Sequence, residues 1–259
     1  MSPRDAMFSV AGAGRRRCQA RLAAVLAGAL LGSGCASHGL PHTSPTQSVP
    51  GQDFSGVWWV EQPERTLLPI DGASVPLTPA GRRQYDEYRA QLQAGKIEDL
   101  TRKYCLPDGL PRLLTAPYPF EVVLTRHQAT FLHEARHVYR AIPLDVQHPP
   151  PQMMLDNYMG NSVARWEGDT LVIDSIRFND ETKLDVSGLP HSDQLHVTER
   201  WRKIDGGRRL QDEITIDDPP IFTMPWSTRI TFAYRPDLTI NEYVCGEPHR
   251  NRSSTGGAR

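Results

Sequence analysis

A series of short β-strand signals, closely spaced through the second half of the chain, constrains the fold more than any other feature. These segments are rich in Val, Ile, Thr and aromatic residues, and several alternate polar and apolar positions. Glu167-Gly168-Asp169 and Asp205-Gly206-Gly207 have the composition of tight hairpin turns. The pattern predicts sequential antiparallel strands at 54–60, 120–125, 130–134, 137–142, 162–166, 171–176, 194–202, 208–217, 227–234 and 240–245.

So many strands with few helices favour a closed or nearly closed antiparallel barrel, because closure removes exposed sheet edges. The predicted fold class is therefore mainly β. Thr78-Pro79 has the pattern of an N-cap followed by proline in the first helical turn, and the charged stretch to about residue 100 has helical periodicity. This stretch predicts one peripheral N-terminal helix.

Two strands carry a carboxylate on their otherwise apolar face, Glu199 in 194–202 and Asp212 in 208–217. A carboxylate on an inward face is unfavourable unless it is paired or has a function. One interpretation is a structural ion pair with a nearby arginine such as Arg140 or Arg165. The other is a polar patch in a barrel lumen that binds a ligand.

The first 35 residues have the pattern of a secretory signal, with four arginines before an uncharged run at 22–31 and small residues before Cys35. This arrangement is similar to a bacterial lipoprotein signal, which implies lipidation of Cys35 and a membrane anchor through that lipid. The predicted organisation is a signal peptide at 1–34, a flexible Ser- and Pro-rich tether at 35–52, one barrel domain at 53–250 and a disordered tail at 251–259. The expected location is the periplasm or the outer membrane.

Charge and cysteine content limit the partners of the mature chain. The full chain has a net charge of −1, and the predicted signal removes five Arg and one Asp, so the mature chain is more acidic. This balance argues against nucleic acid as a partner. Cys105 and Cys245 remain as a pair in an oxidising compartment, and we predict a disulfide between them.

Several motifs resemble known families. Gly56-Val57-Trp58 resembles the GxW opening of lipocalin and calycin barrels. The segments GNSVARWEGDTLV (160–172), PHSDQLHVTERW (190–201) and IDDP (216–219) resemble a large family of exported bacterial β-barrel proteins. The resemblance implies a calycin-like barrel and export for most of the mature chain, and it implies no particular reaction.

The same resemblance marks a set of polar residues as typical of that family. From these we predict acid/base residues and ligand contacts at a pocket of the barrel. His137 and His191 are the acid/base candidates, with Glu134 or Glu199 orienting them. The predicted ligand contacts are Arg140, Asn179, Asp180, Ser192, Trp166 and Trp201. For each polar residue, the alternative is a purely structural role in which it caps a loop.

A second interpretation comes from His133-Glu134-Ala135-Arg136-His137, which matches HExxH. On a helix, His133 and His137 would bind zinc, with Glu134 as the general base of a metallopeptidase. Arg136 beside the metal, and the lack of a third ligand downstream, argue against this reading. If residues 130–142 instead form a hairpin, the zinc geometry disappears.

The sequence therefore predicts a barrel that binds a small, partly hydrophobic molecule and transforms it by cofactor-independent acid/base chemistry of the hydratase, lyase, isomerase or cyclase type. One alternative is a non-enzymatic carrier like the lipocalins. The other is the zinc metallopeptidase. No phosphate-binding loop or dinucleotide fingerprint is present, so we expect no organic cofactor.

Overall fold

The computed structural model describes residues 52–97 and 99–245, so almost all of the predicted signal, tether and tail lies outside the described residues. The helices of this part are α1 (Pro79–Gln93) and α2 (Leu100–Tyr104). The strands are β1 (Gly56–Val60), β2 (Phe120–Leu124), β3 (Gln128–His133), β4 (Tyr139–Pro143), β5 (Asn161–Glu167), β6 (Thr170–Ile176), β7 (His196–Ile204), β8 (Arg209–Asp217) and β9 (Trp226–Tyr234).

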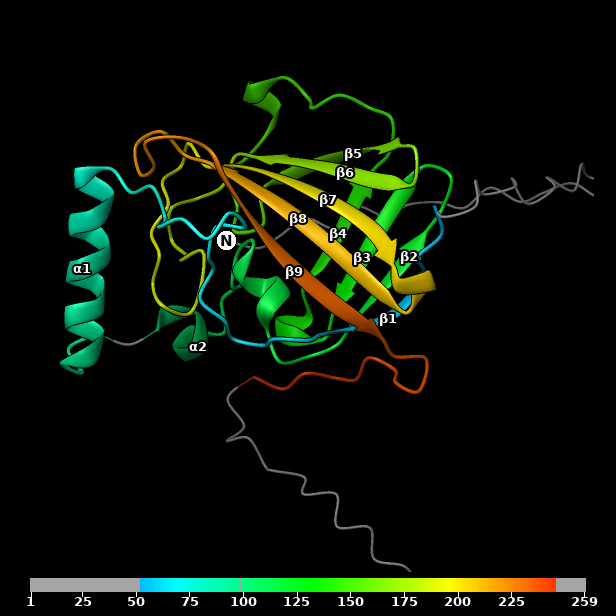
Figure 1. Ribbon diagram of the computed structural model, residues 1–259, viewed down its shortest axis with the longest axis horizontal. Coiled ribbons are helices and arrows are strands. Elements are labelled where there is room, and N and C mark those ends of the chain that lie inside the picture. Colours follow the sequence, from blue (N-terminus) through cyan, green and yellow to red (C-terminus); the bar gives the residue numbers. More distant parts are fainter. Residues whose placement is uncertain (1–51, 98, 246–259) are drawn as a thin grey trace, which may run out of the picture. The chain divides into compact units, whose positions relative to one another are not determined.

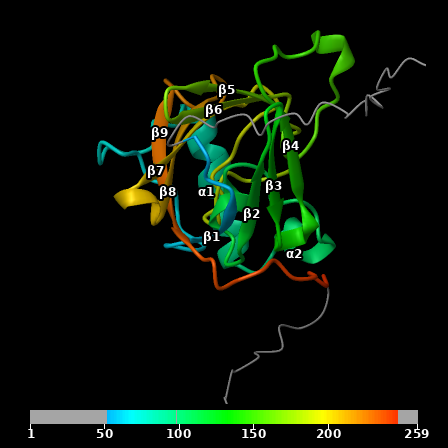
Figure 2. The same cartoon turned by 90° about the vertical axis from the view of Figure 1, so that its right-hand side faces the viewer.

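The nine strands form one sheet in the order β4-β3-β2-β1-β9-β8-β7-β6-β5. Strands that follow one another in the chain pair antiparallel, except β4 and β5, and β1 also pairs antiparallel with β9. Figures 1 and 2 show β5 to β9 curving around as one wall opposite β1 to β4. This confirms the prediction of a mainly antiparallel, nearly closed barrel of the calycin type.

The remaining seam, between β4 and β5, follows from the number of strands. An up-and-down barrel of nine strands cannot alternate direction all the way round, so one neighbouring pair has to run parallel. That pair is β4 and β5, joined by a parallel bridge between Leu144 and Ala164. The Asp145 backbone N–H donates to the Ala164 carbonyl at 2.8 Å. A long connection at 145–160 returns the chain across this seam.

Buried and more exposed residues alternate along the strands that form the barrel interior. Along β8, every second residue is buried, and the adjacent β7 follows the same rule over most of its length. Aromatic rings fill the centre, where the Trp201 ring lies 5.1 Å from Phe131 and 5.2 Å from Phe232, measured between centroids. These three rings are among the largest fully buried side chains of the described residues.

Helix α1 begins as predicted and ends earlier. The Thr78 hydroxyl accepts a hydrogen bond from the Gly81 N–H at 3.0 Å, and Pro79 occupies the first turn. Instead of continuing to residue 100, the helix ends at Gln93, because Gly95 adopts a left-handed φ of 64° that stops it. The short α2, which the sequence did not indicate, follows. Among the described residues, no helix is long and apolar enough to cross a membrane.

The C-terminal segment (residues 235–245) forms no strand, which corrects the prediction of one at 240–245. Side chains of the β3–β4 turn satisfy its backbone instead of a neighbouring strand. The Asn241 N–H donates to Glu134 Oε2 at 2.8 Å, and the Tyr243 N–H donates to His137 Nε2. The predicted disulfide is confirmed, and it joins Cys105 at the end of α2 to Cys245.

Candidate functional site

A buried ion pair lies inside the barrel. The Arg140 guanidinium on β4 donates to both carboxylate oxygens of Glu199 on β7, at 3.0 Å for Nη1 to Oε1. Trp201 Nε1 also donates to Glu199 Oε1 at 3.2 Å. Glu199 is 0% exposed and Arg140 is 5% exposed. The two-point geometry satisfies the inward carboxylate, as the ion-pair interpretation with Arg140 predicted. Arg165, the other candidate partner, pairs with Glu167 at the surface.

Asp212, the second inward carboxylate, is held differently. Its Oδ1 accepts a hydrogen bond from the Arg200 backbone N–H at 3.0 Å, whereas its Oδ2 has no partner among the described residues. Burial, reinforced by the negative charge of Glu199, raises the pKa of Asp212 well above its usual value. The site of Asp212 beside the Arg140–Glu199 pair therefore favours the neutral, protonated form of its carboxyl group.

His133 also points into the interior. It is buried on β3, and its ring stacks on Phe120 with 5.2 Å between centroids. Burial, followed by the positive charge of Arg140, lowers the pKa of His133 to about 3. Its Nε2 has no hydrogen-bond partner among the described residues. His133 is therefore a neutral core residue near pH 7.

These contacts leave no room for a ligand around the central polar residues. Glu199, Asp212 and Trp201 have no accessible surface, so no water-sized space touches their side chains. Trp166, another predicted ligand contact, packs its ring edge against Phe54 at 5.9 Å between centroids. The structure thus fills the predicted lumen site at Arg140, Glu199 and Trp201 with protein side chains.

The HExxH segment is a hairpin, which corrects the zinc interpretation. β3 ends at His133, a single 3₁₀ turn spans Ala135–His137, and β4 begins at Tyr139. His133 faces the barrel core, whereas His137 contacts the C-terminal segment, so the two imidazoles lack the shared helical face that zinc binding requires. Within residues 52–97 and 99–245, no group of three or more His, Cys, Asp or Glu side chains is placed to hold a metal ion.

The predicted residues near position 190 lie on the β6–β7 loop (residues 177–195). The Ser192 N–H and hydroxyl both donate to the carboxylate of Asp218 at 2.6 Å. Asp180 is exposed, and the side-chain oxygen of Asn179 accepts only a long bond from the Glu181 N–H, at 3.4 Å. Ser192 and Asn179 therefore hold the loop, and their hydrogen bonds are directed within the protein.

His191 forms a well-defined pair with Thr182. Its Nδ1 lies 3.1 Å from the Ser192 carbonyl oxygen, which can only accept, so Nδ1 carries the proton. Burial lowers the pKa of His191 to about 4, so the ring is neutral near pH 7. Its Nε2 is then an acceptor, and the Thr182 hydroxyl donates to it at 2.8 Å. In this pair, the His191 imidazole is a base that is hydrogen-bonded to the hydroxyl group of Thr182.

A cleft of about 670 Å³ opens beside this pair, outside the barrel. Helices α1 and α2 form one side of it, and the β6–β7 loop forms the other. The side chains that define its chemistry are Tyr88, Lys96, Asp99, Arg112, Thr182 and Lys183. Sequence reasoning placed only the neighbouring Asp180 and His191 in a site. It missed the cleft because its walls come from segments about 90 residues apart.

Two glycines allow the walls of the cleft to approach closely. Gly188 adopts a φ of 90°, and the Tyr88 ring of α1 occupies the space where a Cβ would lie. Gly109, with a φ of 74°, receives the Thr182 side chain in the same way. The Tyr85 hydroxyl also lies 2.8 Å from Ser187 Oγ, which ties α1 to the loop. Close packing and a hydrogen bond between the helices and the β6–β7 loop therefore fix the positions of the cleft walls.

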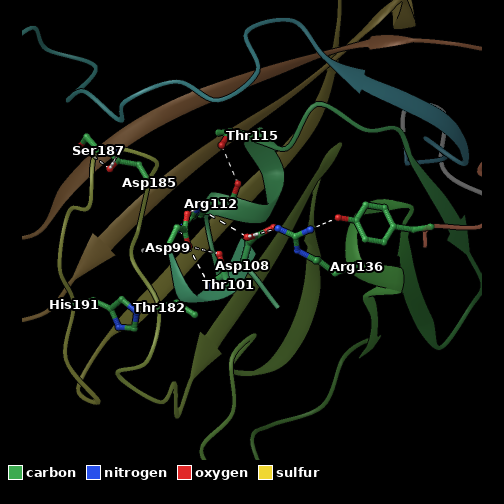
Figure 3. A network of polar contacts seen from close by, with 11 residues as sticks. Asp99, Thr101, Asp108, Arg112, Thr115, Arg136, Thr182, Asp185, Ser187 and His191 are labelled. Carbon is green, nitrogen blue, oxygen red and sulfur yellow. Dashed lines mark hydrogen bonds and ion pairs between the residues drawn. The ribbon is translucent and has the colours of Figure 1, made fainter. Parts of the chain in front are cut away.

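A chain of charged contacts connects the cleft to the C-terminal segment (Figure 3). Arg112 is buried and pairs with the carboxylate of Asp99 on the cleft side. Arg112 Nε also lies 3.9 Å from Asp108, which is 3.7 Å from Arg136. The guanidinium of Arg136 then donates to the Tyr243 hydroxyl. These alternating charges hold Arg112 in place at the floor of the cleft.

Comparison with known proteins adds no assignment to this geometry. A scan against protein-family models found no match for the chain, and a search of curated proteins found none either. The resemblance to exported bacterial barrel proteins therefore stays a prediction, and the function has to be argued from the site.

Proposed function

We propose that this chain is an exported, calycin-like barrel protein that binds a small, partly hydrophobic molecule in the cleft beside the barrel. The observation that carries the proposal is the contrast between the open cleft and the filled lumen. A cleft of about 670 Å³ lies between α1 and the β6–β7 loop, while the lumen carboxylates of Glu199 and Asp212 have no accessible surface. Binding sites for small molecules are commonly concave and of this size.

The lining of the cleft suits a ligand with both apolar and polar parts. On the helix side, the Tyr88 ring and Ile97 offer apolar surface and Asp99 a polar group. On the loop side, Thr182 and Lys183 offer polar groups. A few polar groups among apolar ones orient a ligand without a large desolvation penalty. We therefore expect a ligand with an apolar body and one polar end.

Export and lipid anchoring are part of the proposal. The Cys105–Cys245 disulfide supports an oxidising compartment, in agreement with the signal pattern before Cys35. A lipid at Cys35 would attach the protein to the membrane through the tether. Intact-mass measurement on the mature protein, beside a Cys35→Ala variant, tests this step, because only the lipidated form carries the added mass of acyl chains.

The binding site is tested with two variants of α1. A library of small apolar and amphipathic molecules is screened against the mature protein by ligand-observed NMR. Gln91→Trp places a large ring in the cleft, and we expect it to abolish binding of the hits. Gln93→Trp, two residues along the same helix and outside the cleft lining, is the control that should retain binding. Equal binding by both variants would place the ligand elsewhere.

A second candidate function is acid/base chemistry on the bound molecule. The specific observation in its favour is the Thr182–His191 pair, in which Thr182 lines the cleft and its hydroxyl donates a hydrogen bond to the neutral imidazole of His191. His191 can take a proton from Thr182 while the Thr182 oxygen takes one from the ligand, so the ligand's proton is replaced by one held on His191 Nε2, and the reverse relay returns a proton to the product. This proposed chemistry does not use His137, Glu134 or Glu199, because they contact the C-terminal segment or Arg140 instead.

Turnover distinguishes an enzyme from a carrier. Each NMR hit is incubated with the protein, and products are sought by mass spectrometry. In an enzyme, Thr182→Val removes the relayed hydroxyl while keeping the side-chain shape, and it should abolish turnover with little effect on affinity. If no hit is converted, or if Thr182→Val turns over at the normal rate, the acid/base function is wrong and a carrier remains.

A further inference from the structure

We propose that the cleft recognises its ligand through a carboxylate group bound by the Lys183 ammonium, with the apolar body of the ligand against the Tyr88 ring. This inference rests on the proposed function, since it names the chemical class of the molecule in the same cleft. The predicted ligands are small monocarboxylates with an aromatic or aliphatic body.

Lys183 is the partly buried lysine of the cleft, and no carboxylate among the described residues forms an ion pair with it. Its Nζ lies 5.4 Å from the centroid of the Tyr88 ring, and the side chain is partly buried. Within the described part of the chain, Lys183 makes no hydrogen bond or ion pair. A partly buried ammonium that meets only the face of a ring lacks the anion that would compensate its desolvation.

The nearby carboxylates have other partners or lie at longer range. Asp99 pairs with Arg112, and Glu181 Oε2 accepts a hydrogen bond from the Tyr158 hydroxyl. The negative charge of Asp180 raises the pKa of Lys183 without an ion pair between the two side chains, and Asp180 is itself exposed. Lys96, also at the cleft, is exposed to solvent, so Lys183 provides the partly buried positive charge for a ligand to neutralise.

The distribution of lysines supports the same conclusion. Three of the four lysines of the chain, Lys96, Lys103 and Lys183, line this one cleft, although the chain as a whole is slightly acidic. Clustered cations in a concave surface concentrate the field and draw anions toward it. Lys183 therefore lies in a local positive potential that favours an anionic ligand.

The charge count favours a carboxylate over a phosphate monoester. The fork of Arg112, which would suit a phosphate, is already occupied by Asp99. The remaining point charge of Lys183 matches one negative charge. Burial is the main cause that lowers the pKa of the Lys183 ammonium, so a bound carboxylate would raise it again. Binding should weaken as the pH rises toward the lysine pKa.

The experiment compares three probes that share one ring: benzoate, its neutral analogue benzyl alcohol, and phenyl phosphate. Each is titrated into the mature protein, and affinity is measured by NMR chemical-shift changes of cleft residues. We expect benzoate to bind about tenfold or more tightly than benzyl alcohol, and at least as tightly as phenyl phosphate.

Variants then assign the effect to one side chain. Lys183→Met should weaken benzoate binding about tenfold and leave benzyl alcohol unchanged, while Lys183→Arg should keep most of the affinity. Lys203→Met removes the same charge outside the cleft, where Lys203 Nζ donates to the Asp53 carbonyl, and should have no effect.

Other outcomes separate this inference from the proposed function. If benzyl alcohol binds the cleft as tightly as benzoate, or if Lys183→Met binds benzoate normally, the cleft binds small molecules but the carboxylate inference is wrong. If phenyl phosphate binds more tightly than benzoate, a phosphate is the recognised group and the carboxylate assignment falls. If no probe shifts any cleft residue, both proposals fail.

Discussion

The ring of Tyr88 lies in the space that a Cβ atom would occupy at position 188, so the contact between α1 and the β6–β7 loop depends on Gly188 having no side chain. This contact fixes one end of the cleft. It joins a helix near the start of the domain to a loop 100 residues later. The local sequence of neither segment predicts this contact.

Gly188→Ala should therefore destabilise the protein more than an ordinary glycine substitution. Both Gly188 and Gly168 have positive φ, so alanine adds backbone strain of about 1–2 kcal/mol at either position. Only at Gly188 does the new methyl group overlap Tyr88, which should add about 1–3 kcal/mol. Urea unfolding of both variants measures the difference, and equal midpoints would contradict the close contact.

The Arg140–Glu199 pair is predicted to be essential to the barrel. Arg140→Met leaves a fully buried carboxylate without its partner, which should reduce the free energy of unfolding by about 3–5 kcal/mol. Arg165→Met is the matched control, because Arg165 forms an exposed pair with Glu167 and should change stability by less than about 1 kcal/mol. Similar losses in the two variants would refute a special role for the buried pair.

His133 should make the protein sensitive to acid. Its pKa is about 3 in the folded state and 6.5 as the ordinary value, so the unfolded chain binds a proton that the folded protein does not. The stabilising effect of the neutral ring is complete above pH 6.5 and is lost as the pH falls toward 3. We expect His133→Phe to match the wild type at pH 7.5 and to exceed its stability by about 2–3 kcal/mol at pH 4.5. Thermal unfolding across this range is the measurement, and parallel pH profiles would exclude the effect.

Asp212 should have the opposite effect on the pH dependence of stability. Its pKa is raised in the folded state, so the folded protein keeps a proton that the unfolded chain releases above its ordinary value of 3.8. Stability is therefore highest below that value and falls as the pH rises through the folded pKa. Asp212→Asn mimics the neutral acid, and we expect it to equal the wild type near pH 3.5 and to be more stable at pH 7. Denaturant titrations at both pH values decide this, and a less stable variant at pH 7 would show an ionised Asp212.

The disulfide is expected to hold both the C-terminal segment and the α2 side of the cleft. Cys105 and Cys245 are 140 residues apart, so their link restricts the unfolded chain strongly, and Cys245→Ser should cost about 2–5 kcal/mol. The variant should also be cleaved faster by chymotrypsin after Tyr243. A reductant should reproduce both effects in the wild type and change nothing in the variant. If reduction changed neither the stability nor the proteolysis of the wild type, the prediction would be contradicted.

Local patterns were sufficient to predict most of the barrel. Alternation along 194–202 and 208–217 predicted which side chains turn inward, and it identified Glu199 and Asp212 as buried carboxylates before their partners were known. The exception at 240–245 has a clear cause. Its apolar composition is compatible with a strand, but Glu134 and His137 bind its backbone in place of a neighbouring strand.

The candidate site could not be predicted in the same way. The resemblance selected His137, Glu134, Asn179 and Ser192, and the structure engages each of them in contacts within the protein. Tyr88, Thr182 and Lys183 carry no local signal. Their significance arises only where α1, α2 and the β6–β7 loop come together.

By itself, the sequence determined the strands, their hairpin order, the start of α1, the signal pattern and the cysteine pair, because strand alternation, turns and caps depend on residues close together in the chain. Tertiary structure alone decided that the lumen is filled, that Arg140 and not Arg165 pairs with Glu199, and that a cleft opens beside Thr182 and His191. These features depend on which side chains from distant segments share one small volume, and packing of the whole domain sets that arrangement.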